Sequence, residues 1–244
     1  IGGARFDGST TYVNTVYSSS IQTNGSISSW QNLSLLPDNL SLGGAVTVGD
    51  WIYFMGGFNN TGTKQSIYYA PINANGTIGS WITSDISLPA PMFAFGMVAY
   101  QNNIVIVGGV VDILGVTDKV YKTSVSPANG SLSAWQETAS LPHLNNGQNQ
   151  TIIVGKKIIM AGGGDNSNLL NNVYHTDVNP DGTGAPWQES INPLPQPIGA
   201  GALVHANGYL YFTGGYSGGY LDTVYKTKLN LDINLAVPLL KQTD

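Results

Sequence analysis

The chain has 244 residues, a formal net charge of −5 and only 9% charged residues. It contains no cysteine and only 9 lysine and arginine residues, which excludes disulfides and thiolate chemistry and argues against a nucleic-acid partner. No segment approaches the roughly 20 apolar residues that span a bilayer, so we expect no membrane-spanning segment.

Four landmarks recur in fixed order, roughly 50 residues apart, which indicates repeated structural units. The first is a glycine pair: Gly2-Gly3, Gly56-Gly57, Gly108-Gly109, Gly162-Gly163 and Gly214-Gly215. The second is an aliphatic–tyrosine pair: Val16-Tyr17, Ile67-Tyr68, Val120-Tyr121, Val173-Tyr174 and Val224-Tyr225. The third is a turn dipeptide: Asn24-Gly25, Asn75-Gly76, Asn129-Gly130 and Asp181-Gly182. The fourth is a tryptophan followed by Leu-Pro: Trp30, Trp81, Trp135 and Trp187.

The second unit shows the predicted strands in chain order. Residues 44–48 and 51–57 are short apolar runs joined at Gly49-Asp50, which indicates a tight hairpin. Residues 66–72 carry the aliphatic–tyrosine pair and form the third strand, and Trp81 marks the fourth. The Asn-Gly dipeptide between these two strands favours a type I′ turn. We expect four strands in each unit, with the tryptophan packed between neighbouring sheets, whereas Trp51 lies outside the pattern.

The order of glycine pair, tyrosine, tryptophan and Leu-Pro resembles the kelch class of β-propeller over residues 1 to about 228. The Leu-Pro pairs lack the arginine that often follows them in kelch repeats, so the chain resembles the divergent galactose-oxidase type. The resemblance implies an all-β single domain over residues 1–244, with four-stranded blades at about 1–36, 37–88, 89–141, 142–194 and 195–244.

The two end units are incomplete as repeats. The first begins at its glycine pair, and the fifth has neither an Asn-Gly turn nor a tryptophan after Tyr225. Five glycine pairs therefore fit either a five-bladed ring with an irregular seam or part of a six- or seven-bladed ring. We favour the second alternative, in which the chain is part of a larger ring and other segments of a longer chain would be its partners.

The resemblance places the loops after the second strands, and the loops between blades, on one face that binds ligands. The variable sequence of these loops fits such a face. They contain aromatic and amide side chains of the kind that bind sugars. The candidate ligand residues are Phe58, Asn59, Phe93, His143, Asn145, Asn146, Asp165, Tyr216 and Tyr220.

Catalytic and metal sites have little support in the residue counts. The copper site of galactose oxidase needs a cysteine, and sialidase-type propellers need an arginine cluster, whereas Arg5 is the single arginine. The loop residues with metal-ligand chemistry have no diagnostic spacing, so we expect the aspartates to cap turns, His143 to be a loop side chain, and no cofactor or metal: Asp7, Asp38, Asp112, His143 and Asp165. Glu137 and Glu189 follow equivalent tryptophans and are not expected to converge as a catalytic pair.

Three functions remain open. The first, which we favour, is an extracellular, non-enzymatic module that binds a protein or a glycan or has a structural role. The second is a carbohydrate-active enzyme or lectin-like domain with its site at the channel mouth, and the third is a metal-dependent enzyme unrelated to galactose oxidase. Low charge and several sequons favour an extracellular glycoprotein, with glycosylation candidates at Asn24, Asn32, Asn39, Asn59, Asn75, Asn129 and Asn149.

Overall fold

The structure is a computed structural model that describes residues 1–145, 150–229 and 240–241. In these residues the only helix is a short 3-10 turn, η1 (Asp112–Leu114), and every other regular element is a β-strand. All strand pairs are antiparallel. The all-β expectation is therefore confirmed.

Four sheets have four strands each, in the order first, second, third and fourth strand of a unit. Sheet II contains β5 (Gly44–Val48), β6 (Trp51–Met55), β9 (Ile67–Pro71) and β10 (Ile82–Thr83). Sheet III contains β12 (Gly96–Tyr100), β13 (Asn103–Val107), β16 (Val120–Ser124) and β17 (Gln136–Glu137). Sheet IV contains β18 (Gln150–Val154), β19 (Lys157–Ala161), β20 (Val173–Asp177) and β21 (Gln188–Glu189). Sheet V contains β22 (Ala202–Ala206), β23 (Tyr209–Thr213), β24 (Val224–Lys228) and β25 (Leu240–Lys241).

The remaining strands form smaller sheets. Sheet I pairs β3 (Tyr17–Ser18) with β4 (Gln31–Asn32), which correspond to the third and fourth strands of a unit. Two hairpins follow glycine pairs: β1 (Gly3–Phe6) with β2 (Thr10–Val13), and β7 (Phe58–Asn59) with β8 (Gly62–Thr63). A three-stranded sheet joins β11 (Met92–Phe93), β14 (Val110–Val111) and β15 (Gly115–Val116).

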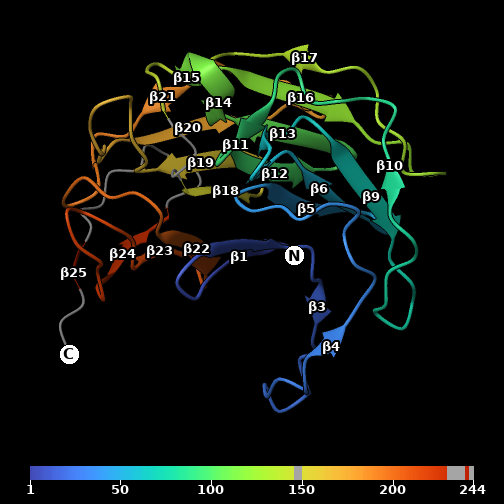
Figure 1. Ribbon diagram of the computed structural model, residues 1–244. Coiled ribbons are helices and arrows are strands. Elements are labelled where there is room, and N and C mark those ends of the chain that lie inside the picture. Colours follow the sequence, from blue (N-terminus) through green and yellow to red (C-terminus); the bar gives the residue numbers. More distant parts are fainter. Residues whose placement is uncertain (146–149, 230–239, 242–244) are drawn as a thin grey trace.

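Sheets I to V follow one another in an arc (Figure 1), from sheet I at the lower right to sheet V at the lower left. The first strands of sheets II to V lie along the inner side, where β5 contacts β12, β12 contacts β18, and β18 contacts β22. Within the described residues, no helix has the length and apolar character that a bilayer crossing requires.

The hairpin predictions are confirmed in position, but the predicted Asn-Gly turn type is wrong. Val48 pairs with Trp51 across the expected two-residue turn. In the Asn-Gly turns between third and fourth strands, the glycine has positive φ, +80° at Gly76, but the asparagine before it does not. A type I′ turn requires positive φ at both positions. The asparagine carboxamide instead accepts the N–H two residues ahead, as Asn75 Oδ1 does from Thr77 at 3.1 Å.

Each neighbouring pair of sheets encloses an apolar core. Between sheets I and II, Val16 and Leu36 pack with Phe54 and Tyr68. Corresponding cores join sheet II to III, sheet III to IV and sheet IV to V. Trp81, Trp135 and Trp187 pack in the first three of these cores, as expected from the repeat. Trp30 is an exception: its side chain is 67% exposed.

The turn of one sheet also packs on the sheet before it. The Gly130 turn of sheet III lies on Trp51 of sheet II, whose Nε1 donates to Pro127 O at 3.4 Å, and Tyr53 Oη donates to Gly130 O at 2.8 Å. This contact gives Trp51 its structural role. We call this contact turn docking.

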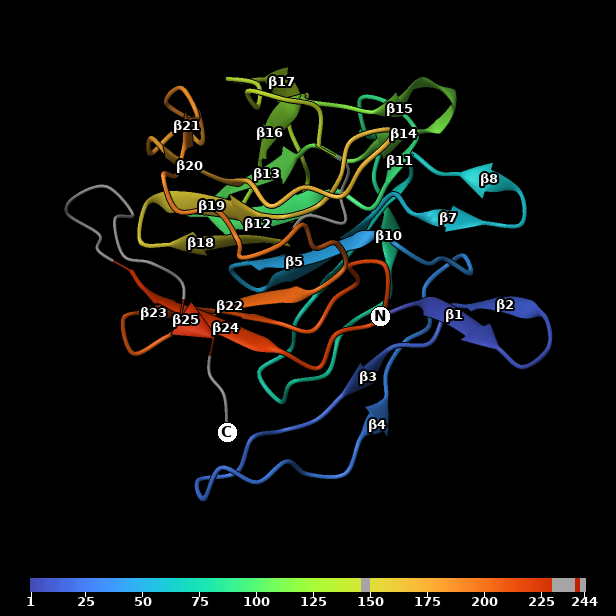
Figure 2. The same cartoon turned by 90° about the vertical axis from the view of Figure 1, so that its left-hand side faces the viewer.

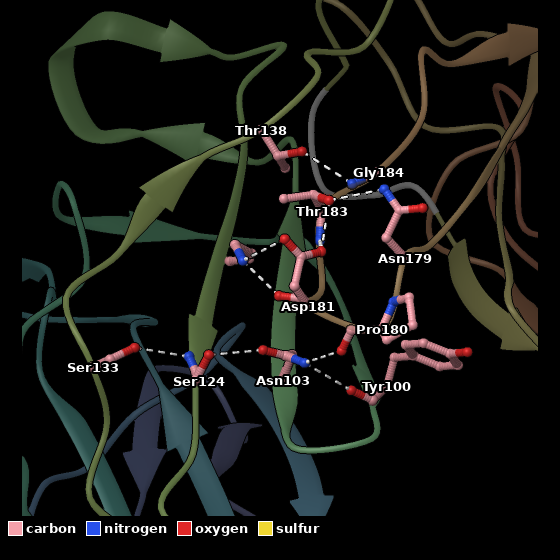
Figure 3. Close-up of polar contacts among 11 residues, drawn as sticks. Tyr100, Asn103, Ser124, Ser133, Thr138, Asn179, Pro180, Asp181, Thr183 and Gly184 are labelled. Atoms are coloured by element: carbon pink, nitrogen blue, oxygen red, sulfur yellow. Dashed lines mark hydrogen bonds and ion pairs between the residues drawn. The ribbon is translucent and has the colours of Figure 1, made fainter.

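Sheets III and IV repeat turn docking with polar partners (Figure 3). Asn103 Nδ2 donates to Pro180 O at 3.2 Å, and Gly184 N donates to Thr138 Oγ1 at 3.1 Å. Lys122 Nζ donates to Asp181 O at 2.5 Å. A β-carbon at Gly182 would lie 2.8 Å from Asn103, so the turn approaches the sheet closely.

Candidate ligand-binding face

The two sets of loops that the resemblance places on one face are hydrogen-bonded to each other. Ser41, between sheets I and II, forms a bridge with Phe58 after β6. Similarly, β11 pairs with β14, and Gly199 forms a bridge with Tyr216. Figure 2 shows the hairpins β1–β2, β7–β8 and β14–β15 projecting from the same side of the molecule. We call this side the loop face.

Two of the candidate residues meet in an aromatic cluster on the loop face. The ring centroids of Phe58 and Phe93 are 5.7 Å apart. Tyr12, from the β1–β2 hairpin, lies edge-on to Phe58 at 5.8 Å. All three side chains are half-buried, so the cluster retains exposed ring surface. We define the aromatic cluster as Tyr12, Phe58 and Phe93.

Asn59, beside this cluster, is a structural residue. Its side chain is only 8% exposed. Its Nδ2 donates to Asn39 O at 3.1 Å and to the Asp38 carboxylate at 3.3 Å, and its Oδ1 accepts from the Thr61 amide at 2.9 Å. The asparagine thus uses its carboxamide to connect two loops, and it supports the position of Phe58.

A hollow of about 430 Å³ adjoins the aromatic cluster, and Phe93 belongs to both. We call it the central hollow. Its walls come from the starts of the inner strands and the loops before them, with none of the described lining residues charged. They are Leu42, Gly43, Gly44, Ala45, Phe93, Ala94, Phe95, Gly96, Met97, Val110, Gln150, Thr151 and Ala200.

The rim of the central hollow has a repeated backbone conformation. Leu42, Ala94 and Ala200 each lie two residues before an inner strand, and their φ angles are +59°, +51° and +57°. Left-handed φ is costly for residues with a β-carbon, so the surrounding structure must impose it. The Ala94 amide donates to the Leu42 carbonyl at 2.8 Å, which links two of these positions directly.

His143 and Asp165 line a second hollow, of about 390 Å³, together with Leu144, Leu170, Asn172 and Tyr174. The carboxylate of Asp165 accepts the amides of Ser167 and Asn168 at 2.7 and 2.6 Å. These backbone hydrogen bonds lower the pKa of Asp165. The carboxylate therefore caps its own loop, as expected for the loop aspartates.

Tyr174, in the wall of the second hollow, and Asn145 each have a buried polar atom without a described partner. Among the described residues, neither the Tyr174 hydroxyl nor Asn145 Oδ1 has a hydrogen-bond partner. Burial, with a smaller contribution from Glu189, raises the pKa of Tyr174 to about 12. Asn145 is fully buried and donates to Gly162 O at 3.0 Å, so it belongs to the scaffold. Its neighbour in the sequence, Asn146, lies outside the described residues.

Tyr216 and Tyr220 form a third group, on the loop after β23. Their rings meet edge to face at 5.6 Å, and Tyr220 is 95% exposed. The candidate residues thus form three separate groups. The structure does not bring all of them into one site.

Glu137 and Glu189 occupy equivalent places in sheets III and IV. Glu137 and Glu189 lie on the outer strands β17 and β21, where they accept from Lys119 and Asn172 at 2.5 Å. In the described part of the chain, no three histidine, aspartate or glutamate side chains are grouped as metal ligands.

The sequons divide by accessibility. Asn24, Asn32, Asn39, Asn75 and Asn129 are exposed, Asn59 is buried, and Asn149 lies outside the described residues.

Sequence reasoning missed Tyr12 and the glycine- and alanine-lined hollow. The Asp7-Gly8 dipeptide, a common turn signal, could have indicated the hairpin that brings Tyr12 to Phe58. Small residues before the inner strands gave no signal of a hollow, because their effect depends on how the sheets meet. In comparisons with known proteins, no family model matches the chain, and no curated protein matches its sequence.

Proposed function

We propose that this chain is a kelch-type propeller module that binds a neutral glycan at its loop face, outside the cell and without catalysis. The observation that carries the proposal is the uncharged central hollow with the aromatic cluster at its edge. A sugar ring presents an apolar face of C–H groups and a rim of hydroxyls, so it can pack on an aromatic ring beside polar groups.

The chemistry around the hollow favours a sugar over other ligands. An anionic ligand would need cationic side chains, and the described lining residues are uncharged. Gln150 and Thr151 supply polar groups to the same wall that contains the apolar side chains of Phe93, Phe95 and Met97. The propeller assignment is supported by the repeat order and by four-stranded sheets arranged in that order.

A glycan array probed with the whole chain tests the proposal. We expect binding to neutral oligosaccharides and at least tenfold weaker binding by Phe93→Ala. The matched control is Phe6→Ala, which removes an exposed aromatic ring from the β1–β2 hairpin, and its binding should be unchanged. No binding on the array, or equal losses in both variants, would contradict the proposed site, and release of a cleaved sugar would contradict the absence of catalysis.

The proposed location has its own test. Expression through a eukaryotic secretory pathway should give glycans on Asn24, Asn75 and Asn129, whose side chains are exposed in turns. Asn59 should remain unmodified, because it is buried and its Nδ2 is hydrogen-bonded. Site-resolved mass spectrometry of the secreted chain measures this, and failure of secretion would count against an extracellular location.

A further inference from the structure

Sheet I exposes apolar residues whose equivalents in sheets II to IV are buried or half-buried. Trp30 is 67% exposed, against 8% for Trp187 at the same place in sheet IV. Ile27 is 63% exposed, against 9% for Ile78 in sheet II. Tyr17 also lies on this face and is 51% exposed. We call Tyr17, Ile27 and Trp30 the sheet I face.

In sheets II to IV the equivalent face always covers the preceding sheet. Ile78 and Trp81 pack with Val16 and Leu36 of sheet I. Trp187 donates from Nε1 to Ala139 O of sheet III at 3.0 Å. The internal repeats therefore show what the sheet I face fits: the opposite face of another sheet of the same kind.

Sheet V presents such an opposite face. Tyr209 begins β23 as Trp51 begins β6, and Tyr211 is the third residue of its strand, as Tyr53 is. Lys226 is the third residue of β24, as Lys122 is of β16. We call Tyr209, Tyr211 and Lys226 the sheet V platform. Near it, Val204 of β22 is 48% exposed.

The sheet V platform combines the groups that perform turn docking elsewhere. In sheet II a tyrosine hydroxyl binds the turn carbonyl and an aromatic ring lies beneath the glycine. In sheet III the ammonium of Lys122 binds the Asp181 carbonyl, which precedes Gly182 of the docked turn. Sheet V has both kinds of group, and the ammonium of Lys226 lies 5.9 Å from the centre of the Tyr209 ring.

We propose that sheet I of one copy of this chain packs on sheet V of a second copy, with the Asn24-Gly25 turn docked on the sheet V platform. The Tyr211 hydroxyl donates to the Gly25 carbonyl, as Tyr53 does to Gly130. Lys226 donates to the Asn24 carbonyl, as Lys122 does to Asp181. Trp30 and Ile27 are then covered by the second copy.

The two surfaces differ, so the association is head to tail and extends beyond a dimer unless it closes into a ring.

Gly25 must remain glycine in the contact, because at the equivalent Gly130 a β-carbon would lie 2.4 Å from the Trp51 ring. Within one copy, nothing lies within 4 Å of a β-carbon at Gly25 or at Gly76. Their φ angles, +82° and +80°, are also alike. Gly76→Val is thus a matched control for Gly25→Val.

Sedimentation velocity of the purified chain over a wide concentration range gives the first test. We expect the mean mass to rise above that of a monomer as concentration increases. Gly25→Val should weaken association at least tenfold, and Gly76→Val should leave it unchanged. A wild-type chain that stays monomeric overturns the proposal, as do equal effects of the two substitutions.

Charge reversal tests the other surface. Lys226→Glu should weaken association at least tenfold, whereas Lys228→Glu, at the exposed end of the same strand, should not. An equal mixture of Gly25→Val and Lys226→Glu retains one intact interface per pair of chains, so it should form dimers that do not grow. If the mixture stays monomeric while circular dichroism shows both variants folded, the head-to-tail arrangement is overturned.

Discussion

Glycine serves both backbone conformation and close packing in the Asn-Gly turns, and a comparison of Gly130 with Gly76 distinguishes the two. Both residues have positive φ, +71° and +80°, which favours glycine over residues with a β-carbon. Only Gly130 is also in close contact, with the Trp51 ring 2.4 Å from the site of a β-carbon. The same dipeptide therefore serves backbone conformation in one turn and both conformation and packing in the other.

Substituting alanine should separate the two functions. Gly76→Ala should lower the free energy of unfolding by about 1 kcal/mol, from backbone strain alone. Gly130→Ala adds overpacking against Trp51 and should cost about 2–4 kcal/mol in total. Urea denaturation of the two variants measures the difference. Equal losses would show that turn docking adds nothing to stability.

Two buried tyrosines should respond to loss of the hydroxyl with opposite signs. Burial, followed by the nearby Tyr69, raises the pKa of Tyr53 well above its usual range, and its hydroxyl donates to Gly130 O at 2.8 Å. Tyr53→Phe should cost about 1 kcal/mol, because the carbonyl loses its partner. Tyr174→Phe should be neutral or stabilising by up to about 1 kcal/mol, because its hydroxyl has no described partner. Thermal unfolding of both variants checks this, and a large loss at Tyr174 would reveal a hidden hydrogen bond.

At the scale of an element, β20 carries a buried histidine and, at its end, a partly buried ion pair with β19. Burial, and then the charge of Lys157, lowers the pKa of His175, while Asp177 raises it by a smaller amount. Lys157 Nζ lies 2.6 Å from Asp177 Oδ1, and this hydrogen bond lowers the pKa of Asp177. The lowered pKa favours a neutral His175 imidazole beside the charged side chains of Lys157 and Asp177.

These shifts predict a loss of stability in mild acid. A histidine whose folded pKa is depressed contributes fully above its unfolded pKa of about 6.5 and loses that contribution as the pH falls below it. The contribution of Asp177 is lost only below about pH 4, near the unfolded carboxylate pKa. The free energy of unfolding, measured by urea denaturation between pH 7 and 5, should therefore decline as the pH falls. His175→Gln should make this decline smaller. His205→Gln, on the exposed part of β22, should keep the wild-type slope.

The strands could be predicted from sequence because their signal is local. Apolar runs and two-residue turns placed β5, β6 and β9 correctly. The type I′ assignment failed because the Asn75 carboxamide binds the backbone ahead of it, a competition that a dipeptide rule does not include. Trp30 was expected to pack like the other tryptophans, but its burial depends on a neighbouring sheet and not on its own repeat.

The candidate site was predictable only in part, for the same reason. The two loop sets were expected on one face, and the bridges between them agree with this. Which side chains meet there depends on the angle between sheets, so Tyr12 was missed and Tyr216 and Tyr220 lie apart from the aromatic cluster. The propeller and glycan-binding assignments stay predictions.

At the scale of the whole molecule, each core formed by the described residues joins two sheets that are neighbours in the sequence. A stack of this kind is stabilised by its units and by the interfaces between adjacent units. The interfaces are polarised, because the turn of a later sheet docks on the sheet before it. Neither described turn-docking contact runs in the reverse direction.

This polarity matches the direction of protein synthesis. During synthesis the N-terminal part of a chain leaves the ribosome first, and here sheets II and III each precede the turn that docks on them. In stalled nascent chains, we expect sheet II to gain protection from protease once residues through Trp135 have emerged. The gain should be absent with Gly130→Val, and protection that appears only after the full chain is released would contradict the stepwise order.

The same polarity makes the loss of C-terminal sheets easier to tolerate than the loss of N-terminal sheets when translation goes wrong. A chain that stops early leaves a sheet without the turn that docks on it, but the Gly130 and Gly182 turns, once made, already have sheets II and III to dock on. A chain that starts at an internal methionine begins with turns that have none. For this architecture, premature termination should yield compact, shorter products, and late initiation should yield products that quality control removes.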